Sequence, residues 1–190
     1  MMTDQDFSFL SLVRADLIRH RQVILGRPGA VSAWKLLPAI FSPRFASVLL
    51  CRTAHSLAEI HLGLLARMIS FLNFAVFGIE VALRCRIGPG LVLPHTQGTV
   101  LGAVSIGANA IIFQGVTLGA RELDMGYTAG TRPIVGDGVV IGAGAKVLGG
   151  LLLGDHCRIG ANAVVLESVP AGAVAVGVPA RVASPRDDAS

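Results

Sequence analysis

The sequence predicts a mainly β protein, built as a solenoid of short strands behind a helical N-terminal part. Aliphatic residues recur every six positions from residue 87 onward, whereas the residues before 80 carry helical spacing. The 190 residues are 53% hydrophobic and 5% aromatic, with 23 glycines. That mixture favours many short strands and tight corners over an aromatic core. The length suits one domain with a helical appendage.

The first helix is expected over residues 6–25, "DFSFLSLVRADLIRHRQVIL", where leucine and valine lie three and four positions apart. The stretch "GRPGA" at 26–30 ends it, because glycine and proline interrupt helices. A second, short helix is expected at "SAWKLL", ending before Pro38.

A longer helical stretch begins at Ser42. This residue precedes Pro43, and proline is favoured at the first helical position. We expect helix to about Phe77, with a break near Gly63. The apolar run at 68–79 is too short to span a bilayer.

A six-residue repeat fills the rest of the chain. One series of aliphatic residues, each six after the last, comprises Val135, Ile141, Val147, Leu153, Ile159 and Val165. The upstream series comprises Ile87 and Leu93, then, after one extra residue, Val100, Ile106, Ile112 and Leu118. Each unit predicts one short strand and one corner, with the aliphatic side chain pointing inward. Three strands complete a coil, and stacked coils bury a continuous apolar column.

One segment interrupts this repeat. Residues 120–133, "ARELDMGYTAGTRP", contain no six-residue pattern and are rich in polar residues and glycine. They predict a loop extruded from the coil, and long loops on compact scaffolds often carry function. We therefore expect a helical domain over 1–79, a solenoid over 80–182 and a flexible tail over 183–190.

Charge and cysteine content narrow the classes of function. The net charge of +4 fits anionic ligands, but the basic residues are scattered and aromatics are few, which argues against nucleic acid. The three cysteines, Cys51, Cys85 and Cys157, match neither a disulfide framework nor a zinc motif, so no metal is expected. Asp4 and Asp6 occupy the place of a basic signal-peptide region, which predicts a cytoplasmic protein.

One histidine stands out from the other four. His95 lies in "LVLPHTQGTVLG", among apolar and small residues that give no obvious reason for an imidazole. It is either a packed core residue or a proton carrier. His20, His55 and His61 fall on expected helices, and His156 falls on a turn of the repeat, so structural or surface roles are expected for all four.

Six motifs in order carry a family resemblance over residues 44–182: "FGIEVAL", "LPHTQG", "FQGVTLG", "IGAGAKVLG", "IGANAVV" and "VGVPARV". With them the chain resembles the serine acetyltransferase group of hexapeptide-repeat acyltransferases, and within it the O-acetyltransferases of exopolysaccharide gene clusters. The resemblance implies a left-handed parallel β-helix, acetyl-CoA as acyl donor, and a homotrimer or a dimer of trimers.

The resemblance also assigns a catalytic pair. His95 matches the family's catalytic histidine, and Glu80, fifteen residues earlier, stands where the family has aspartate. His95 would take the acceptor hydroxyl's proton during attack on the thioester, while Glu80 would hold the imidazole in one tautomer. Gln114 or a backbone N–H of the coil would stabilise the oxyanion.

The family binds the coenzyme in a groove between adjacent subunits. Small residues would admit the pantetheine arm, and basic residues would meet the phosphates. The matching positions here are Gly119, Gly142, Ala143, Gly160 and Ala161, with Lys146 and Arg181 as the basic partners.

The acceptor site departs from the family pattern. Pro94 replaces the acid before the catalytic histidine, Thr131-Arg132 replaces an Arg-His pair, and no Asp or Glu lies between residues 16 and 59. An amino acid's ammonium group then has no candidate partner beyond Glu122 and Asp124 of the loop. A missing partner costs about 2–5 kcal/mol for a desolvated charge. We therefore expect a sugar or other small-molecule hydroxyl as acceptor, with Arg121 and Arg132 binding it.

Three alternatives remain. L-serine could be the acceptor after all, as in cysteine biosynthesis. The chain could instead be a non-catalytic scaffold or regulatory subunit, since solenoids often serve as binding platforms. The helical part, expected to pack in the assembly, could also lie on a bilayer, because "LLARMISFLNFAVF" is apolar and has arginines nearby.

Overall fold

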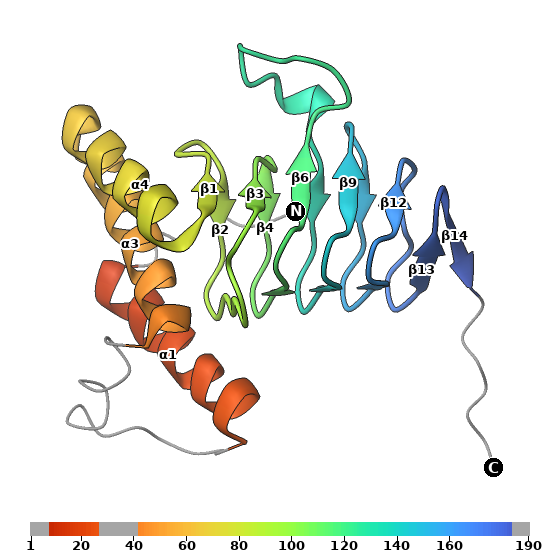
Figure 1. Ribbon diagram of the computed structural model, residues 1–190, viewed down its shortest axis with the longest axis horizontal. Coiled ribbons are helices and arrows are strands. Elements are labelled where there is room, and N and C mark those ends of the chain that lie inside the picture. The colour runs from red at the N-terminus through yellow and green to blue at the C-terminus, as the bar shows by residue number, and fades with distance from the viewer. Residues whose placement is uncertain (1–7, 27–41, 184–190) are drawn as a thin grey trace.

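The computed structural model describes residues 8–26 and 42–183, and Figure 1 shows helices packed against one end of a three-sided coil of short strands. The short helix expected at 32–37 lies outside the described residues, as does the tail after Ala183. Among the helices that are described, none combines the length and apolar character needed to cross a membrane.

Helix α1 (Phe9–Leu25) confirms the first expected helix, with its start three residues later than predicted. The Ser8 side chain caps it by accepting a hydrogen bond from the Ser11 N–H. It ends at Gly26, which adopts the left-handed conformation that glycine reaches at little cost.

The longer helical stretch is also confirmed, as two helices. Helix α3 (Pro43–Glu59) starts with Ser42 at the N-cap and proline at the first helical position, as predicted. Helix α4 (Gly63–Phe77) follows a break at residues 60–62, where His61 has a φ of +63°. His61 therefore lies in a turn and not on a helix. Gly78 ends α4 with φ +65°, and the coil begins at the next residue.

Three sheets form the sides of the coil (Figure 1). The first sheet, called sheet A below, contains β1 (Ile79–Val81), β3 (Thr99–Leu101), β6 (Thr117–Gly119), β9 (Lys146–Leu148) and β12 (Val164–Val165). The second contains β2 (Arg86–Ile87), β4 (Ser105–Ile106), β7 (Ile134–Val135) and β10 (Leu152–Leu153). The third contains β5 (Ile111–Ile112), β8 (Val140–Ile141), β11 (Arg158–Ile159), β13 (Val174–Gly177) and β14 (Ala180–Ala183).

Neighbouring strands are parallel throughout, except that β14 returns antiparallel to β13. Parallel pairing of strands one coil apart is what a solenoid requires, because each coil repeats the path of the one before. The fold is the expected left-handed parallel β-helix behind a helical N-terminal part.

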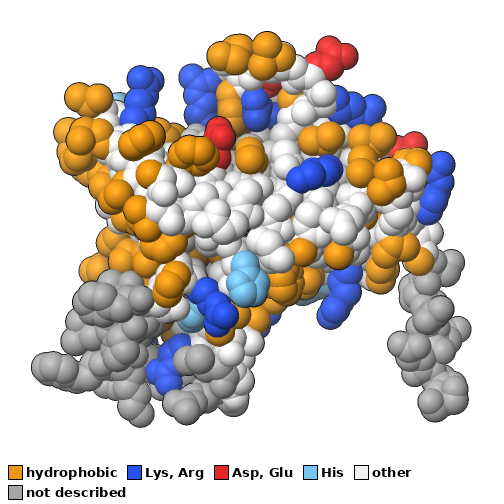
Figure 2. Space-filling model, in the orientation of Figure 1, with side chains coloured by type: hydrophobic (Ala, Val, Ile, Leu, Met, Phe, Trp, Pro, Cys, Tyr) orange, Lys and Arg blue, Asp and Glu red, His pale blue; other side chains and the backbone are white. Residues whose placement is uncertain are grey.

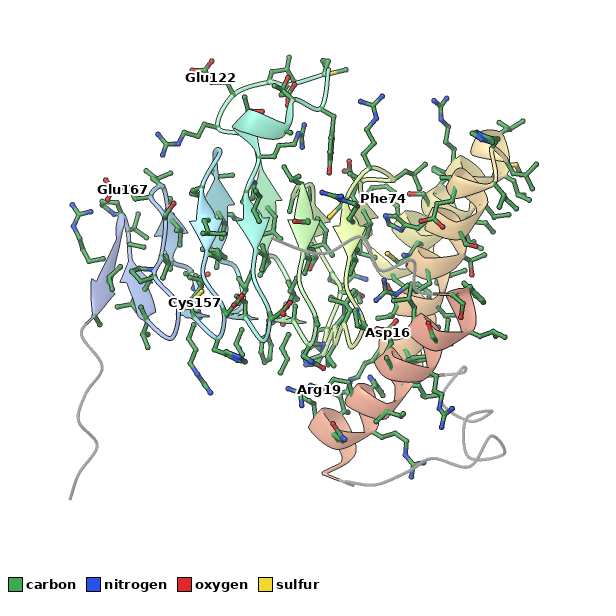
Figure 3. The ribbon with its side chains drawn as sticks, turned by 180° about the vertical axis from the view of Figure 1, so that it is seen from behind. Asp16, Arg19, Phe74, Glu122, Cys157 and Glu167 are labelled. Carbon is green, nitrogen blue, oxygen red and sulfur yellow. The ribbon has the colours of Figure 1, made fainter. Side chains whose placement is uncertain are left out.

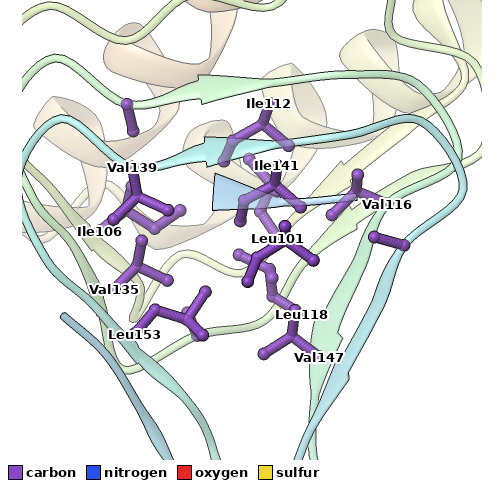
Figure 4. Close-up of a cluster of buried hydrophobic side chains, with 14 of the residues drawn as sticks. Leu101, Ile106, Ile112, Val116, Leu118, Val135, Val139, Ile141, Val147 and Leu153 are labelled. Carbon is purple, nitrogen blue, oxygen red and sulfur yellow. The ribbon is translucent and has the colours of Figure 1, made fainter. Parts of the chain in front are cut away.

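The aliphatic column predicted from the six-residue step fills the coil (Figure 4). Side chains from all three sheets meet there, and the residues of the downstream series are at most 3% exposed. Burying one such side chain contributes about 1.5–3 kcal/mol. The repeat therefore encodes the core directly.

The prediction is wrong at one position of this column. Leu101, and not Val100, points inward: Leu101 is fully buried and pairs with Leu118, whereas Val100 is partly exposed. The segment 94–98, which contains His95, is one residue longer than the equivalent connections into β6, β9 and β12, which are 113–116, 142–145 and 160–163. Leu101 lies eight residues after Leu93 and five before Ile106, so the repeat gains one residue in total, as predicted, but the inward residue of β3 comes one position later.

One corner of the coil precedes the strands of sheet A and is called the amino corner below. It is built from residues 97–98, 114–115, 143–144 and 161–162, which stack because each N–H donates to the carbonyl one coil earlier, as Gly115 does to Gln97 at 3.0 Å. Gly98, Gly115 and Gly144 have φ values of +72°, +72° and +74° there. That conformation favours glycine, which explains the glycine in three of the four turns, and in the fourth Asn162 adopts it with a φ of +58°.

The loop over 120–133 leaves the coil at the opposite end of sheet A, as Figure 1 shows above β6. It contains one 3₁₀ turn, Ala129–Thr131, and rejoins the coil at β7. The extruded loop predicted from the interruption of the repeat is confirmed.

A buried ion pair joins the helical part to the first coil. Asp16 of α1 binds Arg52 of α3 at 2.8 Å, with the two side chains 0% and 5% exposed. Arg52 also donates to the carbonyl oxygens of Ile87 and Gly88, and Asp16 accepts the N–H groups of Gly90 and Leu91. Figure 3 shows Asp16 where α1 meets the coil. This pair fixes how the helices sit on the coil.

Candidate active site

His95 is a surface residue, so it is not the packed core histidine that the sequence left open. It lies in the loop before β3, and its side chain is exposed. Two hydrogen bonds hold this loop against the end of α4: the Thr96 hydroxyl donates to the Phe77 carbonyl at 2.7 Å, and the Gly98 N–H donates to the Gly78 carbonyl at 2.9 Å. The imidazole is therefore accessible while its backbone is fixed.

Glu80 projects from the outer face of sheet A. It is the exposed middle residue of β1, between buried Ile79 and Val81. Strand register places Val100, Thr117 and Lys146 beside it in successive coils. The candidate acid and the candidate phosphate-binding lysine therefore share one row on one face.

The structure brings Glu80 and His95 to the same end of the molecule without bonding them. The loop of His95 is held against Phe77 and Gly78, two and three residues before Glu80. No hydrogen bond or ion pair joins the Glu80 carboxylate to His95 in the described parts of the chain. The structure therefore places the two segments that carry the predicted dyad next to each other, and the dyad itself stays a prediction.

A groove of about 360 Å³ opens at His95. It is lined by the start of α3 and by the loop before β3, namely Ser42, Pro43, Arg44, Pro94, His95, Thr96 and Gln97. No Asp or Glu is among these lining residues. In Figure 2 histidine and basic side chains adjoin where the helical part meets the lower edge of the coil. Imidazole and guanidinium groups in one groove suit an acceptor that carries an anionic group.

Gln114 occupies the amino corner one coil beyond Gln97. Its backbone carbonyl accepts the Gly144 N–H at 2.8 Å, which fixes the residue in the stack. The side-chain Oε1 is buried and has no hydrogen-bond partner among the described residues. The Gln114 Oε1 is therefore an acceptor that still lacks a donor, which a ligand or another chain would have to supply.

The expected coenzyme residues lie at or next to the amino corner in the two coils that follow Gln114. They are Gly142 and Ala143 in one coil and Gly160 and Ala161 in the next. The coil itself explains the glycines: a Cβ at residue 142 would lie 2.6 Å from the Ala161 N, and one at residue 160 would lie 2.7 Å from Val176. Their small size is a requirement of stacking and gives no separate sign of a coenzyme.

Gly119 differs from those glycines. It ends β6, and a Cβ added there would meet no atom of the described chain within 4 Å. Arg181 is exposed on β14, at the far end of the coil. Lys146 donates to the Gly115 carbonyl at 2.5 Å and to the Thr117 hydroxyl at 3.1 Å, so one of its three N–H donors remains for a ligand.

Both arginines of the loop, Arg121 and Arg132, already bind groups of their own chain. Arg132 binds Asp124 at 3.0 Å, donates to the Gly102 carbonyl and lies 4.1 Å over the Tyr127 ring. Arg121 donates to the carbonyl oxygens of Leu148 and Leu166. Each guanidinium anchors the loop to the coil.

Asp124 organises this loop, and the sequence analysis did not identify that role. Partial desolvation acts to raise the pKa of Asp124, but hydrogen bonds from Thr131, Thr128 and Arg132 outweigh it and lower the pKa below its usual value. The residue types gave a general signal, because aspartate side chains in loops often accept nearby backbone N–H groups, as Asp124 does from Thr128 at 2.7 Å.

His95 and the loop arginines lie at opposite ends of sheet A. His95 precedes β3 and Arg121 follows β6, and these two strands are parallel neighbours. Because a three-residue strand already spans about 10 Å, one chain does not bring the two ends together. A site that contains both ends requires a second copy of the chain.

Comparison with known proteins places these features in a family. Residues 132–167 match the model of the bacterial transferase hexapeptide (six repeats). A serine acetyltransferase from Helicobacter pylori strain J99 is 41% identical over 162 residues, which cover 84% of this chain and 91% of that protein. The expected likeness to exopolysaccharide-cluster enzymes finds no support in these comparisons.

Solved structures agree with this placement. Serine acetyltransferase from Neisseria gonorrhoeae matches with a TM-score of 0.80 and 31% identity, over 93% of this chain. The chain spans 65% of the length of that protein. A serine acetyltransferase in complex with CoA matches with a TM-score of 0.74 and 32% identity, over 90% of this chain and 68% of the other.

Proposed function

Since the chain belongs to the serine acetyltransferase family of hexapeptide-repeat acyltransferases, we propose that it transfers an acetyl group from acetyl-CoA to the hydroxyl of L-serine. The observation that carries the proposal is the exposed His95 imidazole, held in a groove by a fixed loop, in a chain with this kinship. It replaces the sugar acceptor that the sequence analysis favoured, because the named relatives are serine enzymes.

His95 acts as the general base. Its unprotonated ring nitrogen takes the proton of the serine hydroxyl as that oxygen attacks the thioester carbonyl. The tetrahedral intermediate collapses, the C–S bond breaks, and the coenzyme A thiolate receives the proton from His95. The products are O-acetylserine and free coenzyme A, and the enzyme returns to its starting state. All three cysteines are buried, so the acetyl group passes directly to serine.

Glu80 and Gln114 support this step. The Glu80 carboxylate would stabilise the imidazolium that forms as His95 gains the proton. The side-chain NH2 of Gln114, at the amino corner one coil beyond Gln97, would donate to the developing oxyanion. One such donor contributes about 2.7–4 kcal/mol to the transition state.

Acetyl-CoA would lie along the outer face of sheet A. Lys146 has one N–H free for a phosphate, and Gly119 leaves open space next to its Cα. Gly142, Ala143, Gly160 and Ala161 line the amino corner along the same route, and Arg181 lies further along the coil. The relative solved with CoA supports this donor.

We further propose that the active protein is a homotrimer or a dimer of trimers. His95 and the extruded loop occupy opposite ends of sheet A, so adjacent copies would have to bring the loop of one chain to the histidine of another. Light scattering after gel filtration measures the mass; a monomer that is fully active would overturn this arrangement.

A sugar hydroxyl is the second candidate acceptor. It is favoured by one observation: no Asp or Glu lines the groove at His95, so the ammonium of serine has no partner there. A neutral polyol needs none.

Release of thiol from acetyl-CoA tests the proposal. The purified protein is assayed with L-serine, with D-serine as a matched control, and with a panel of sugars and sugar nucleotides. Turnover that depends on L-serine is expected. Turnover with a sugar and none with L-serine would identify a sugar hydroxyl as the acceptor. Absence of acetyl-CoA binding would favour a non-catalytic scaffold.

A further inference from the structure

We propose that Arg44 is the residue that recognises the acceptor, by binding its carboxylate, and that the acceptor's amino group is not recognised in the same groove. This inference rests on the proposed function, since it names what the groove at His95 binds. It predicts that hydroxy acids without an amino group are also acetylated.

The first support is position. Arg44 is the second residue of α3, and Ser42, Pro43 and Arg44 form one wall of the groove whose other wall is the His95 loop. The groove of about 360 Å³ is large enough for a small hydroxy acid next to the imidazole. The hydroxyl and carboxylate of such an acid lie on adjacent carbons or one carbon further apart, so His95 and Arg44 could bind both ends of one molecule.

The second support is that Arg44 is free to bind. The ion pairs of the described residues, Arg52–Asp16 and Arg132–Asp124, do not include Arg44, and Arg44 is exposed. Arg121 and Arg132, the cations expected from the sequence, are instead bound to carbonyl groups and to Asp124. Arg44 is the only Lys or Arg among the residues that line the groove.

The third support is the charge around the groove. Burial, together with the charge of Arg44, lowers the pKa of His20, so this neighbour is neutral at pH 7 and adds no second cation. Since no Asp or Glu lines the groove, an anion is attracted to it and an ammonium group gains nothing there. The residues of this groove therefore favour the acid end of the acceptor over its amino end.

Steady-state kinetics with three acceptors test the proposal: L-serine, 3-hydroxypropanoate, which lacks the amino group, and L-serinamide, which lacks the carboxylate. The variants are Arg44→Ala, Arg44→Lys and, as a matched control, Arg86→Ala, an exposed arginine on β2. Circular dichroism checks that each variant is folded.

Arg44→Ala is expected to raise the KM for L-serine and for 3-hydroxypropanoate about tenfold to a hundredfold, as loss of a charged hydrogen bond does. The KM for acetyl-CoA and the weak use of L-serinamide stay unchanged, Arg44→Lys recovers part of the loss, and Arg86→Ala behaves as wild type. Unchanged KM for L-serine in Arg44→Ala, or use of L-serinamide as good as that of L-serine, overturns the proposal.

A binding measurement separates this proposal from the proposed function. If the wild type does not acetylate L-serine, calorimetry with 3-hydroxypropanoate in the presence of coenzyme A follows. Binding that is lost in Arg44→Ala supports the carboxylate site while the serine assignment falls. No binding by the wild type, or equal binding by both proteins, overturns the carboxylate site.

Discussion

The helical part buries polar side chains among its apolar ones, whereas the core of the coil is almost purely apolar. Five of the seven buried polar residues in the described chain belong to the helices: Asp16, His20, Ser47, Arg52 and Asn73. The coil buries an almost purely aliphatic column. On the surface the contrast reverses, because α4 exposes large apolar side chains, among them Leu64, Met68, Phe71 and Phe74 (Figures 2 and 3).

This difference favours packing of the helical part against another surface. In the coil, successive strands cover one another and leave small corner residues outside. In the helices, the Ser47 hydroxyl and the Asn73 Oδ1 are buried without partners among the described residues, while apolar groups face outward. A helix that is apolar on its exposed side normally packs against another surface.

The largest expected effect tests the buried charges of the helical part. Asp16→Ala should lower the free energy of unfolding by about 3–5 kcal/mol, because it leaves Arg52 charged and buried without its partner. Chemical denaturation measures this, with Glu59→Ala, an exposed acid at the end of α3, as control. Equal losses for the two variants would mean that the junction is not held by the ion pair.

The aliphatic column gives the next effect. Leu118→Ala should cost about 3 kcal/mol, because the neighbouring coils cannot close the cavity it leaves. Leu152→Ala on β10, where the side chain is 50% exposed, is the matched control and should cost far less. Similar costs at both positions would contradict the view that stability comes from the inward-facing residues.

The exposed face of α4 should affect assembly more than stability. Phe71→Ser, at a side chain that is 70% exposed, should change the free energy of unfolding of a single chain by no more than about 0.5 kcal/mol. If α4 packs between copies, the mass in solution falls. An unchanged mass by light scattering would show that this face has no role in the assembly.

The smallest effect concerns the extruded loop and pH. The pKa of Asp124 is lower in the folded protein than in the unfolded chain, so its stabilising bonds are present at neutral pH. They are lost as the pH falls through that lowered value. Hydrogen exchange over residues 124–132 should be faster in Asp124→Asn than in wild type at pH 7, and the two should converge in acid. A constant difference at all pH values would contradict this account.

The six-residue spacing was enough to predict the coil, because every inward position must be aliphatic and every corner must be small. It failed at Val100, since two aliphatic residues adjoin there and the length of the His95 loop decides which one points inward. The extruded loop was predictable for the same reason: a segment without the repeat cannot form a coil.

The site was only partly predictable. Motifs identified His95 and Glu80 as candidates, but no pattern links Arg44 to a histidine fifty-one residues later, and only the packing of α3 on the coil brings them together. The roles given to Arg121 and Arg132 depended on their being free. Whether a side chain is already bonded to its own backbone cannot be read from composition or spacing.

The most direct test of the central claim, that His95 is the base of an acetyl transfer, is kcat/KM for acetyl-CoA and L-serine in His95→Ala. His156→Asn, at an exposed turn with φ +59° that asparagine tolerates, is the matched control. We predict a loss of about 10²–10⁴-fold for His95→Ala, as for removal of a general base, and no loss for the control. Folded His95→Ala protein with wild-type kcat/KM would contradict the claim.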